Sequence, residues 1–302
     1  MTDNCRDRTL IIDGGLGRTI TAIPALEKFV QENSNTTILV HGWAPVVYGN
    51  KILGPSVFDF KTKGNFERIR NTSISKPEPY YETAYINQQI HLIDAWNRCI
   101  NNSTDALSIP KIYLSNNEKN NLWNVKTSKK LVAFQPFGST AYHTNAGVVD
   151  NSNRSMSTLM SKLILKRLVQ ENYDVLFITD KQVPWNLDCM FIPGIFYGPR
   201  DLAGAIYQCD YFVGIDSAGQ HIARCLRKPG TVVLGSTSAV NISYADFFNI
   251  IDIAPDASYK GLRISDEDLY IDEIENADIM DVPLQQLHGY IDNILNHIKT
   301  TT

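Results

Sequence analysis

Short apolar runs that end in loops rich in glycine, serine or threonine recur through this 302-residue chain. Residues 9–13 form the first such run, Gly14-Gly15-Leu16-Gly17 follows it, and residues 18–30 carry apolar side chains at helical spacing. A second β-rich run covers residues 36–40. This order of strand, glycine turn, helix and strand predicts a βαβ unit and therefore a parallel sheet. Pro24 is expected to kink the helix or restart it.

A second series of the same kind fills the rest of the chain, so the sequence predicts an α/β fold of two facing Rossmann-like domains with parallel sheets and a C-terminal helix. A polar stretch places the linker near residues 122–130, which gives domains at 1–128 and 129–302. Residues 82–101 read as one helix, and Asp201 could cap another. The remaining strands are expected at 131–135, 174–179, 189–192, 211–214 and 231–234, and the helices at 155–170, 201–208, 218–226 and 284–298.

Charge and cysteine content narrow the class of protein. The net charge of −4 weighs against a general nucleic-acid binder. The five cysteines are scattered and form no C-x-x-C pair, which fits a protein of a reducing compartment and argues against a zinc ribbon or a disulfide scaffold. No apolar run approaches the ~18 residues of a membrane span, and no signal-peptide core is present. We therefore expect a cytoplasmic protein without an integral membrane segment. Asp266-Glu267-Asp268 lies in a polar stretch and is read as a solvated surface, so no metal site is predicted.

The first glycine loop suits an anionic ligand. Gly15 and Gly17 let a ligand approach the backbone, and the start of the following helix favours negative charge. The loop is not a dinucleotide fingerprint, because Ile20 stands where the third glycine is needed and no acid follows the second strand. The alternative is a tight strand-to-helix turn that needs small residues for packing.

A second candidate site follows the strand at 211–214. The backbone amides of Ala218 and Gly219 would bind a diphosphate at the start of a helix. Asp216 would accept hydrogen bonds from ribose hydroxyls or fix the turn, and the Ser217 hydroxyl would meet a ligand or cap the helix. His221 lies one helical turn further, where it could reach a phosphate or a sugar or serve only the packing.

Two more strands end in small polar loops, at residues 135–140 and 234–238. The carboxyl ends of parallel strands are where ligands bind in open α/β folds. The agreement of four such loops predicts one crevice that all of them line.

These segments resemble glycosyltransferase family 9, the family of the ADP-heptose–lipopolysaccharide heptosyltransferases, which has the GT-B fold. The second half of the chain matches well, whereas residues 44–120 match loosely. The resemblance is carried by Gly14-Gly-Leu-Gly-Arg-Thr-Ile-Thr-Ala-Ile-Pro-Ala-Leu26, Gln135-Pro-Phe-Gly-Ser139, Phe212-Val-Gly-Ile-Asp-Ser-Ala-Gly-Gln-His-Ile-Ala223, Leu234-Gly-Ser-Thr-Ser238 and the closing helix at 282–295.

The resemblance implies an inverting transfer of a sugar from a nucleoside-diphosphate sugar to an acceptor hydroxyl, without a metal and without a cofactor beyond this co-substrate. The donor would lie against the second domain and the acceptor against the first. The acceptor would be a surface glycan or a hydroxymethylated base in DNA. The donor positions that the resemblance implies are Asp216, Ser217, Ala218 and His221, with Ser139, Thr140, Arg154 and Thr237 beside them.

One position departs from the family. Its members carry an acidic general base directly after the glycine of the first loop, where this chain has Arg18, which cannot act as a base. Asp13 is the acid left in the loop and is our candidate base, unless it only caps the glycine turn. Arg18 would bind an anionic acceptor or the leaving diphosphate. The departure leaves two alternatives: a catalytically impaired nucleotide-sugar-binding protein, or a sugar-nucleotide epimerase, which would need acids and a histidine in the cleft.

Overall fold

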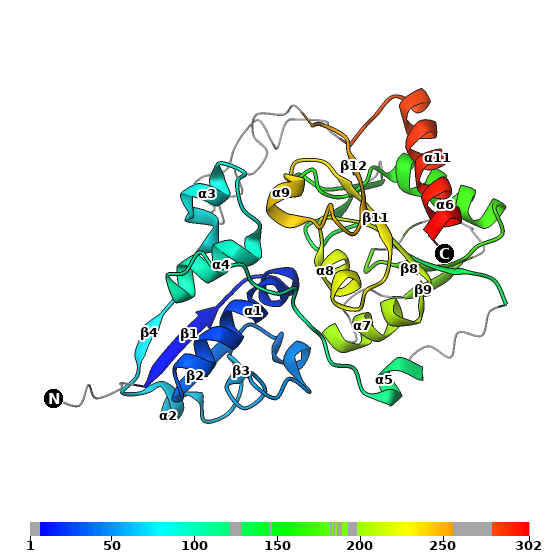
Figure 1. The fold of residues 1–302 in the computed structure, drawn as a ribbon. Helices are drawn as coiled ribbons and strands as arrows, with labels where there is room; N and C mark the ends of the chain where they lie inside the picture. The colour runs from blue at the N-terminus through cyan, green and yellow to red at the C-terminus, as the bar shows by residue number, and fades with distance from the viewer. Residues whose placement is uncertain are drawn as a thin grey trace.

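The computed structural model describes residues 7–120, 128–144, 147–181, 183, 185, 189–192, 198–255 and 280–301. Figure 1 shows two α/β halves side by side, one coloured blue to cyan and the other green to red. The described strands are β1 (Arg8–Ile12), β2 (Thr36–Val40), β3 (Val57–Asp59), β4 (Ser73–Ser75), β5 (Leu131–Gln135), β6 (Tyr142–Thr144), β7 (Gly147–Val149), β8 (Asp174–Ile178), β9 (Met190–Ile192), β10 (Tyr211–Ile215), β11 (Gly230–Leu234) and β12 (Asn249–Asp252). The described helices are α1 (Leu16–Glu32), α2 (Asn65–Ile69), α3 (Thr83–Ile86), α4 (Leu92–Asn101), α5 (Asn116–Asn120), α6 (Thr158–Gln170), α7 (Pro199–Gln208), α8 (Ala218–Cys225), α9 (Ala239–Ile242) and α11 (Leu284–Thr301), with 3-10 turns η1 (Ala44–Val47) and η2 (Pro79–Tyr81).

The first sheet has the strand order β3-β2-β1-β4, and all its pairings are parallel. Helix α1 connects β1 to β2 and buries Leu16, Ile20, Ile23 and Leu26, which recur every three or four residues and so share one face. The helix runs through Pro24 without interruption, so the predicted restart at Pro24 is wrong. Burial of apolar side chains on both sides of the proline outweighs the one backbone hydrogen bond that it removes.

The second sheet has the strand order β12-β11-β10-β5-β8-β9 and is parallel throughout. From β5 the chain builds outward through β8 and β9, then returns to place β10 on the other side of β5. The strand order therefore reverses between β5 and β10. In open α/β sheets such a switch point opens a crevice at the carboxyl ends of the two strands.

The C-terminal helix α11 closes the second sheet. Its buried residues are Leu287, Ile291, Ile294, Leu295 and Ile298, which form one apolar stripe. They join a core cluster that includes β5, β8 and β10. A second cluster extends from α1 and the first sheet across to α7, α8 and α9. The two halves thus share a continuous apolar core.

Polar contacts of Arg200 and Asn241 hold the halves together. The Arg200 guanidinium on α7 donates to both carboxylate oxygens of Glu118 and to the backbone carbonyls of Pro45, Tyr48 and Tyr113. All five of its N–H groups are therefore satisfied by the first half of the chain.

The second contact lies on the other side of the shared core. The buried Asn241 amide on α9 donates to the carbonyl of Tyr85 at 2.7 Å and to that of Ile90 at 3.1 Å. Both carbonyls belong to the first half. Because five of these hydrogen bonds, three from Arg200 and two from Asn241, go to backbone carbonyls, the two contacts fix the relative position of the halves.

Some local predictions need correction. The helix expected over residues 82–101 is two helices, α3 and α4, because Gln88 between them has a left-handed backbone (φ 56°). Helix α7 begins at Pro199 after Gly198, so Asp201 lies in its first turn and does not cap it. The edge strands β3, β4 and β12 and the short hairpin of β6 and β7 were not predicted.

Two predictions fall outside the described residues: most of the linker, at residues 121–127, and Asp266-Glu267-Asp268. None of the helices in the described part of the chain combines the length and the apolarity needed to cross a bilayer.

Candidate functional site

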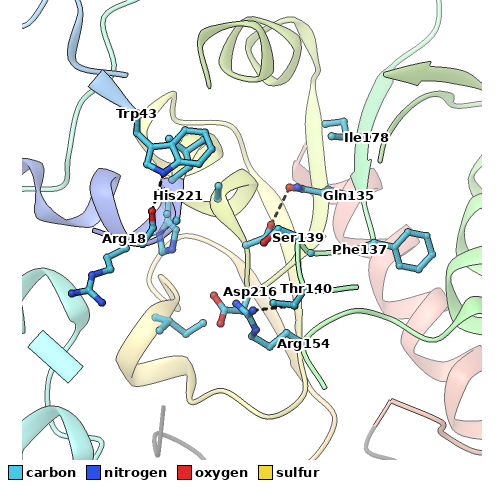
Figure 2. A pocket seen from close by; sticks show the side chains of 18 of the residues that line it. Arg18, Trp43, Gln135, Phe137, Ser139, Thr140, Arg154, Ile178, Asp216 and His221 are labelled. Atoms are coloured by element: carbon cyan, nitrogen blue, oxygen red, sulfur yellow. Dashed lines mark hydrogen bonds between the residues drawn. The ribbon is translucent and has the colours of Figure 1, made fainter. Parts of the chain in front are cut away.

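A cavity of about 450 Å³ lies between the two halves, where loops from both sheets meet at the carboxyl ends of their strands (Figure 2). Of the predicted site residues, those that line it are Gly15, Gly17, Arg18, Ser139, Thr140, Arg154, Asp216, Ser217, Ala218 and His221. Asp13, Gly219 and Thr237 do not line it. The structure thus brings most of the predicted residues to one place, but the predicted loop at 234–238 does not line the cavity.

Two helices begin at this cavity. Helix α1 starts at Leu16 after Gly15, and α8 starts at Ala218 after Ser217. Among the described residues, neither start receives a side-chain cap, and neither first turn contains an acid. The first amides of a helix point outward and carry a partial positive charge. Two such ends at one cavity make a place for an anion.

The two helix starts touch at Gly17. A Cβ atom at Gly17 would lie 3.0 Å from Cδ2 of His221 and 3.6 Å from Cα of Ala218. Glycine is therefore needed here for close approach of one helix to the other. The sequence had assigned Gly17 to the approach of a ligand, and the structure adds the contact with His221.

The second helix start is held by Gln135, the last residue of β5. Ser217 donates its hydroxyl hydrogen to Oε1 of Gln135 at 3.0 Å, so the hydroxyl does not cap α8. A Cβ atom at Gly219 would lie 1.8 Å from the same Oε1. Gly219 thus leaves room for the Gln135 side chain, and Gly219 itself does not line the cavity.

Asp150 organises the loop that carries Thr140 and Arg154. Its carboxylate accepts hydrogen bonds from the hydroxyls of Thr140 (3.0 Å), Ser152 (2.6 Å) and Ser155 (2.5 Å). Arg154 in turn donates to Thr140 at 3.2 Å and to Ser152 at 3.0 Å. Burial raises the pKa of Asp150, but the bonds from Ser152 and Ser155 and the charge of Arg154 outweigh it and leave the pKa lowered. Sequence reasoning missed Asp150, although an aspartate two residues before a serine is an Asx-turn signal.

Arg18 lines the cavity, but its guanidinium group is directed away from it (Figure 2). Its guanidinium lies 2.8 Å from Oε2 of Glu78 and 3.1 Å from Oδ1 of Asp13. It also lies over the rings of Tyr80 and Trp96, about 5 Å from each centre. Figure 2 shows the side chain directed away from the other labelled residues. Its charge is thus neutralised within the first half.

Asp13 is held between two cations. Besides Arg18 at Oδ1, Nζ of Lys76 lies 2.5 Å from Oδ2. This hydrogen bond and the charge of Asp13 raise the pKa of Lys76. Asp13, the candidate base, therefore does not line the cavity, and each of its carboxylate oxygens is in an ion pair.

The sequence did not single out Trp43 and Asp180, which also line the cavity. The Trp43 indole donates to the carbonyl of Gly14 at 2.9 Å, which fixes the ring against the glycine loop. Asp180 follows β8 and pairs with Lys181 at 3.1 Å. Thr237 is buried and does not line the cavity. A tryptophan three residues after a strand end carries no motif, which is why the sequence did not reveal it.

His221 lies at the junction of the halves, in edge-to-face contact with the Tyr244 ring. Its Nδ1 lies 2.9 Å from the Tyr244 hydroxyl. His91, which precedes α4 in the first half, packs against Tyr244 with ring centres 4.9 Å apart. Burial and then the charge of His221 lower the pKa of His91 to about 3, so His91 is neutral near pH 7. The predicted site residue His221 is thus part of a buried cluster.

No protein-family model matches this sequence, and none of the curated proteins matches it. Solved structures do match. Escherichia coli ADP-heptose lps heptosyltransferase II superimposes with a TM-score of 0.63 at 10% identity, over 97% of this chain and 99% of that one. The glycosyl transferase family 9 structure from Veillonella parvula gives 0.62 at 11%, over 98% and 99%. The iron-containing heptosyltransferase TibC, in complex with ADP-D-beta-D-heptose, gives 0.64 at 13%, over 97% and 77%.

The chain has the fold of these glycosyltransferases. The match covers both sheets and the closing helix α11, which confirms the predicted GT-B architecture and, at the level of fold, the resemblance to family 9. In the part of the chain that the structure describes, no group of three or more histidine, cysteine or acidic side chains is arranged to hold a metal ion.

Proposed function

We propose that this protein is a glycosyltransferase that uses a nucleoside-diphosphate sugar. The observation that carries the proposal is the convergence of the uncapped starts of α1 and α8 on one cavity at the switch point of the second sheet. The match to a heptosyltransferase structure that contains ADP-D-beta-D-heptose supports it. A diphosphate is the anion that two helix starts and an arginine suit best.

In this proposal the donor phosphates lie against the amides of Gly17 and Ala218, and Gly15 keeps the first loop open to them. Arg154, oriented through Asp150, would bind a phosphate oxygen, with Ser139 and Thr140 beside it. Asp216 would accept from a ribose hydroxyl, while Gln220 donates to its Oδ1 at 3.2 Å. Trp43 offers a flat apolar surface on the acceptor side of the cavity.

The reaction we propose is an inverting transfer without a metal. The acceptor oxygen forms a bond to the anomeric carbon as the bond from that carbon to the diphosphate oxygen breaks, and that oxygen keeps the electron pair. The acceptor proton passes to a base, for which Asp13 remains our candidate. Among the described residues, the acids that line the cavity are Asp180 and Asp216, which belong to the second half, where the donor would lie. A surface glycan and a hydroxymethylated DNA base remain the two proposed acceptors.

The test is a binding and turnover screen against ADP-, UDP-, GDP- and CDP-sugars. A ligand at 100 times its Kd adds about 2.7 kcal/mol of stability, which shifts the melting temperature measurably. One nucleotide should stabilise the protein, and Arg154→Ala should weaken its binding about tenfold. Arg70→Ala is the matched control, because Arg70 is exposed and does not line the cavity. Flat melting curves with every nucleotide sugar contradict the proposal.

A second candidate function is nucleotide-sugar binding without transfer, and the ion pairs of Asp13 with Arg18 and Lys76 favour it. Each carboxylate oxygen of Asp13 lies against a cation, so neither oxygen is open to an acceptor hydroxyl while these pairs are formed. Asp13→Asn separates the two functions. Loss of nucleotide release from a donor and acceptor pair, with donor binding retained, supports Asp13 as the base. A wild-type protein that binds the donor but transfers no sugar to either class of acceptor supports the binding function.

A further inference from the structure

The outer edge of the first sheet carries a local excess of positive charge. Residues 51–70, which include β3 and α2, contain five basic and two acidic side chains, a net charge of +3. The whole chain has a net charge of −4, so the remaining residues carry −7. β3 is the last strand of its sheet, next to β2. Charge concentrated in this way indicates a surface for an anionic partner, although the chain as a whole is acidic.

Aromatic rings lie exposed among these charges. Phe66 on α2 is 71% exposed, and Phe60, directly after β3, is 37% exposed. The His41 ring meets the Phe60 ring edge to face, with centres 5.8 Å apart. Lys61 and Lys63 are exposed, and among the described residues neither of their ammonium groups is in an ion pair. Together these five residues form a basic edge that offers a partner both positive charge and flat apolar surface.

The basic edge is continuous with the cavity. β2 and β3 are parallel, so His41 and Phe60, which follow them, leave the sheet at its carboxyl end, where the cavity loops also lie. The Asn65 amide donates to the carbonyls of Asp59 at 2.7 Å and Phe60 at 3.1 Å, which holds α2 against the end of β3. Trp43, two residues after His41, lines the cavity. The exposed rings therefore lead along one edge of the sheet to an indole in the cavity wall.

We propose that the basic edge binds a single-stranded polynucleotide, one of whose bases carries the acceptor hydroxyl. The inference rests on the proposed glycosyltransferase function and selects the hydroxymethylated base from its two acceptors. Lysines that contact a phosphate backbone, together with rings on which bases stack, are the combination that binds single strands. A base turned out of the strand would enter the cavity and stack on the Trp43 indole.

Other partners match the basic edge less fully. A DNA duplex presents its phosphates but keeps its bases stacked inside, which leaves the rings of Phe60 and Phe66 without a partner. A neutral glycan can lie on the rings, but it offers no charge to Lys61 and Lys63. A single strand presents phosphates and open base faces along the same chain, so it meets both demands.

Fluorescence anisotropy with a labelled oligothymidylate of about 15 nucleotides tests binding in the absence of any nucleotide sugar. We expect the Kd to rise about tenfold between about 50 and 200 mM salt, because phosphate contacts release counterions. Unlabelled inorganic polyphosphate and phosphomannan compete in parallel, at equal phosphate concentration. Both should displace the labelled strand far less well than unlabelled oligothymidylate does. Absence of binding at the lower salt concentration, or equal displacement by either competitor, would overturn the inference.

Variants separate the charge from the rings. Lys61→Ala with Lys63→Ala should weaken binding and flatten the salt dependence, whereas Phe66→Ala should weaken binding about tenfold and leave the salt dependence unchanged. Lys162→Ala with Lys166→Ala is the matched control, since both lysines are exposed on α6, in the other half. An unchanged Kd in either edge variant, or the same loss of affinity in the control, contradicts the inference.

The binding assay and the donor screen can fail separately. Oligonucleotide binding combined with flat melting curves for every nucleotide sugar would contradict the proposed function, but it would leave the basic edge as a polynucleotide surface. Donor binding without oligonucleotide binding would overturn this inference and leave the surface glycan as the proposed acceptor. When both bind, a hydroxymethylated oligonucleotide should gain the mass of the sugar, and an unmodified one should not. An unchanged mass of the hydroxymethylated strand would overturn its role as acceptor.

Discussion

The two strand-to-helix turns that meet in the cavity are built alike and charged differently. Each follows a strand at the switch point of its sheet, and each leads into a helix without a side-chain cap. The first turn neutralises its own charges, since Arg18 and Asp13 pair with each other and with Glu78 and Lys76. The second turn presents Asp216 and His221 to the cavity.

This difference indicates a division of labour between the halves. The first turn contributes backbone and shape, because its charged side chains are already paired. The second contributes polar side chains that a ligand can meet. Replacing charged side chains in the two turns should therefore have different consequences: loss of stability in the first turn and loss of ligand binding in the second.

The largest effect is expected from Arg18→Ala. The side chain of Arg18 is 7% exposed and pairs with Glu78, whose side chain is 18% exposed. Removing one partner of a buried ion pair costs about 3 kcal/mol, because the other charge is left without compensation. Chemical denaturation measures this loss, and the exposed Arg70→Ala should change stability by less than about 0.5 kcal/mol.

The same variant also decides whether Arg18 serves a ligand. If Arg18→Ala is as stable as Arg70→Ala but loses donor binding, the Arg18 guanidinium turns into the cavity when the donor binds. That outcome would mean that the first turn, like the second, supplies a charged side chain to the ligand.

Asp150→Asn is expected to have the next largest effect, and on the second half. The amide replaces one acceptor oxygen by a donor, so it cannot accept from Ser155, Ser152 and Thr140 together. We expect about 1–2 kcal/mol of lost stability and weaker donor binding, because Arg154 loses its support. Asp292→Asn is the control, since that side chain is 63% exposed. Unchanged donor affinity in Asp150→Asn would show that Arg154 does not depend on this loop for its position.

Gly17→Ala tests the contact between the turns. The new Cβ atom would lie 3.0 Å from the His221 ring, which must shift to accept it. We expect donor affinity to fall about tenfold with little loss of stability, because the clash is with one side chain at the cavity. Calorimetric titration measures the affinity. Gly289→Ala in α11 is the control, since a Cβ atom there meets nothing within 4 Å. Equal affinities in the two variants would place the donor away from Gly17.

The sequence predicted the central strands of both sheets, because their signals are local, and missed the edge strands β3, β4 and β12. Apolar runs followed by glycine loops gave β1, β2, β5, β8, β10 and β11 to within a residue or two, and the apolar stripe of α11 predicted the closing helix. The break near Gln88 was missed because apolar residues on both sides keep the helical spacing. Only the backbone of that residue, with a φ of 56°, ends the pattern.

The site was harder to predict, since its partners lie far apart in the chain. The strand-end loops identified the cavity wall, as the carboxyl ends of parallel strands must share one edge. Sequence spacing does not show which polar side chains contact each other. Glu78 lies 60 residues from Arg18 in the chain, and Tyr244 lies 23 residues from His221. Asp13 was the only acid in its loop, but the loop alone does not show Lys76 beside it.

The smallest effect concerns the contact that fixes one half against the other. The hydrogen bonds from Arg200, opposed in part by burial, lower the pKa of Glu118 from 4.5 to about 2. A carboxylate with a lowered folded-state pKa stabilises the protein above its unfolded pKa and loses this contribution as the pH falls. The wild type should therefore lose stability between about pH 4.5 and pH 2 by more than Glu118→Gln does. For a partly exposed pair in a chain of this size, we expect a difference in Tm of about 2 °C. Melting curves at pH 6 and pH 3 measure it. Parallel pH dependence in both proteins would mean that Arg200 holds the halves through the three carbonyls alone, and that the cavity keeps its width without Glu118.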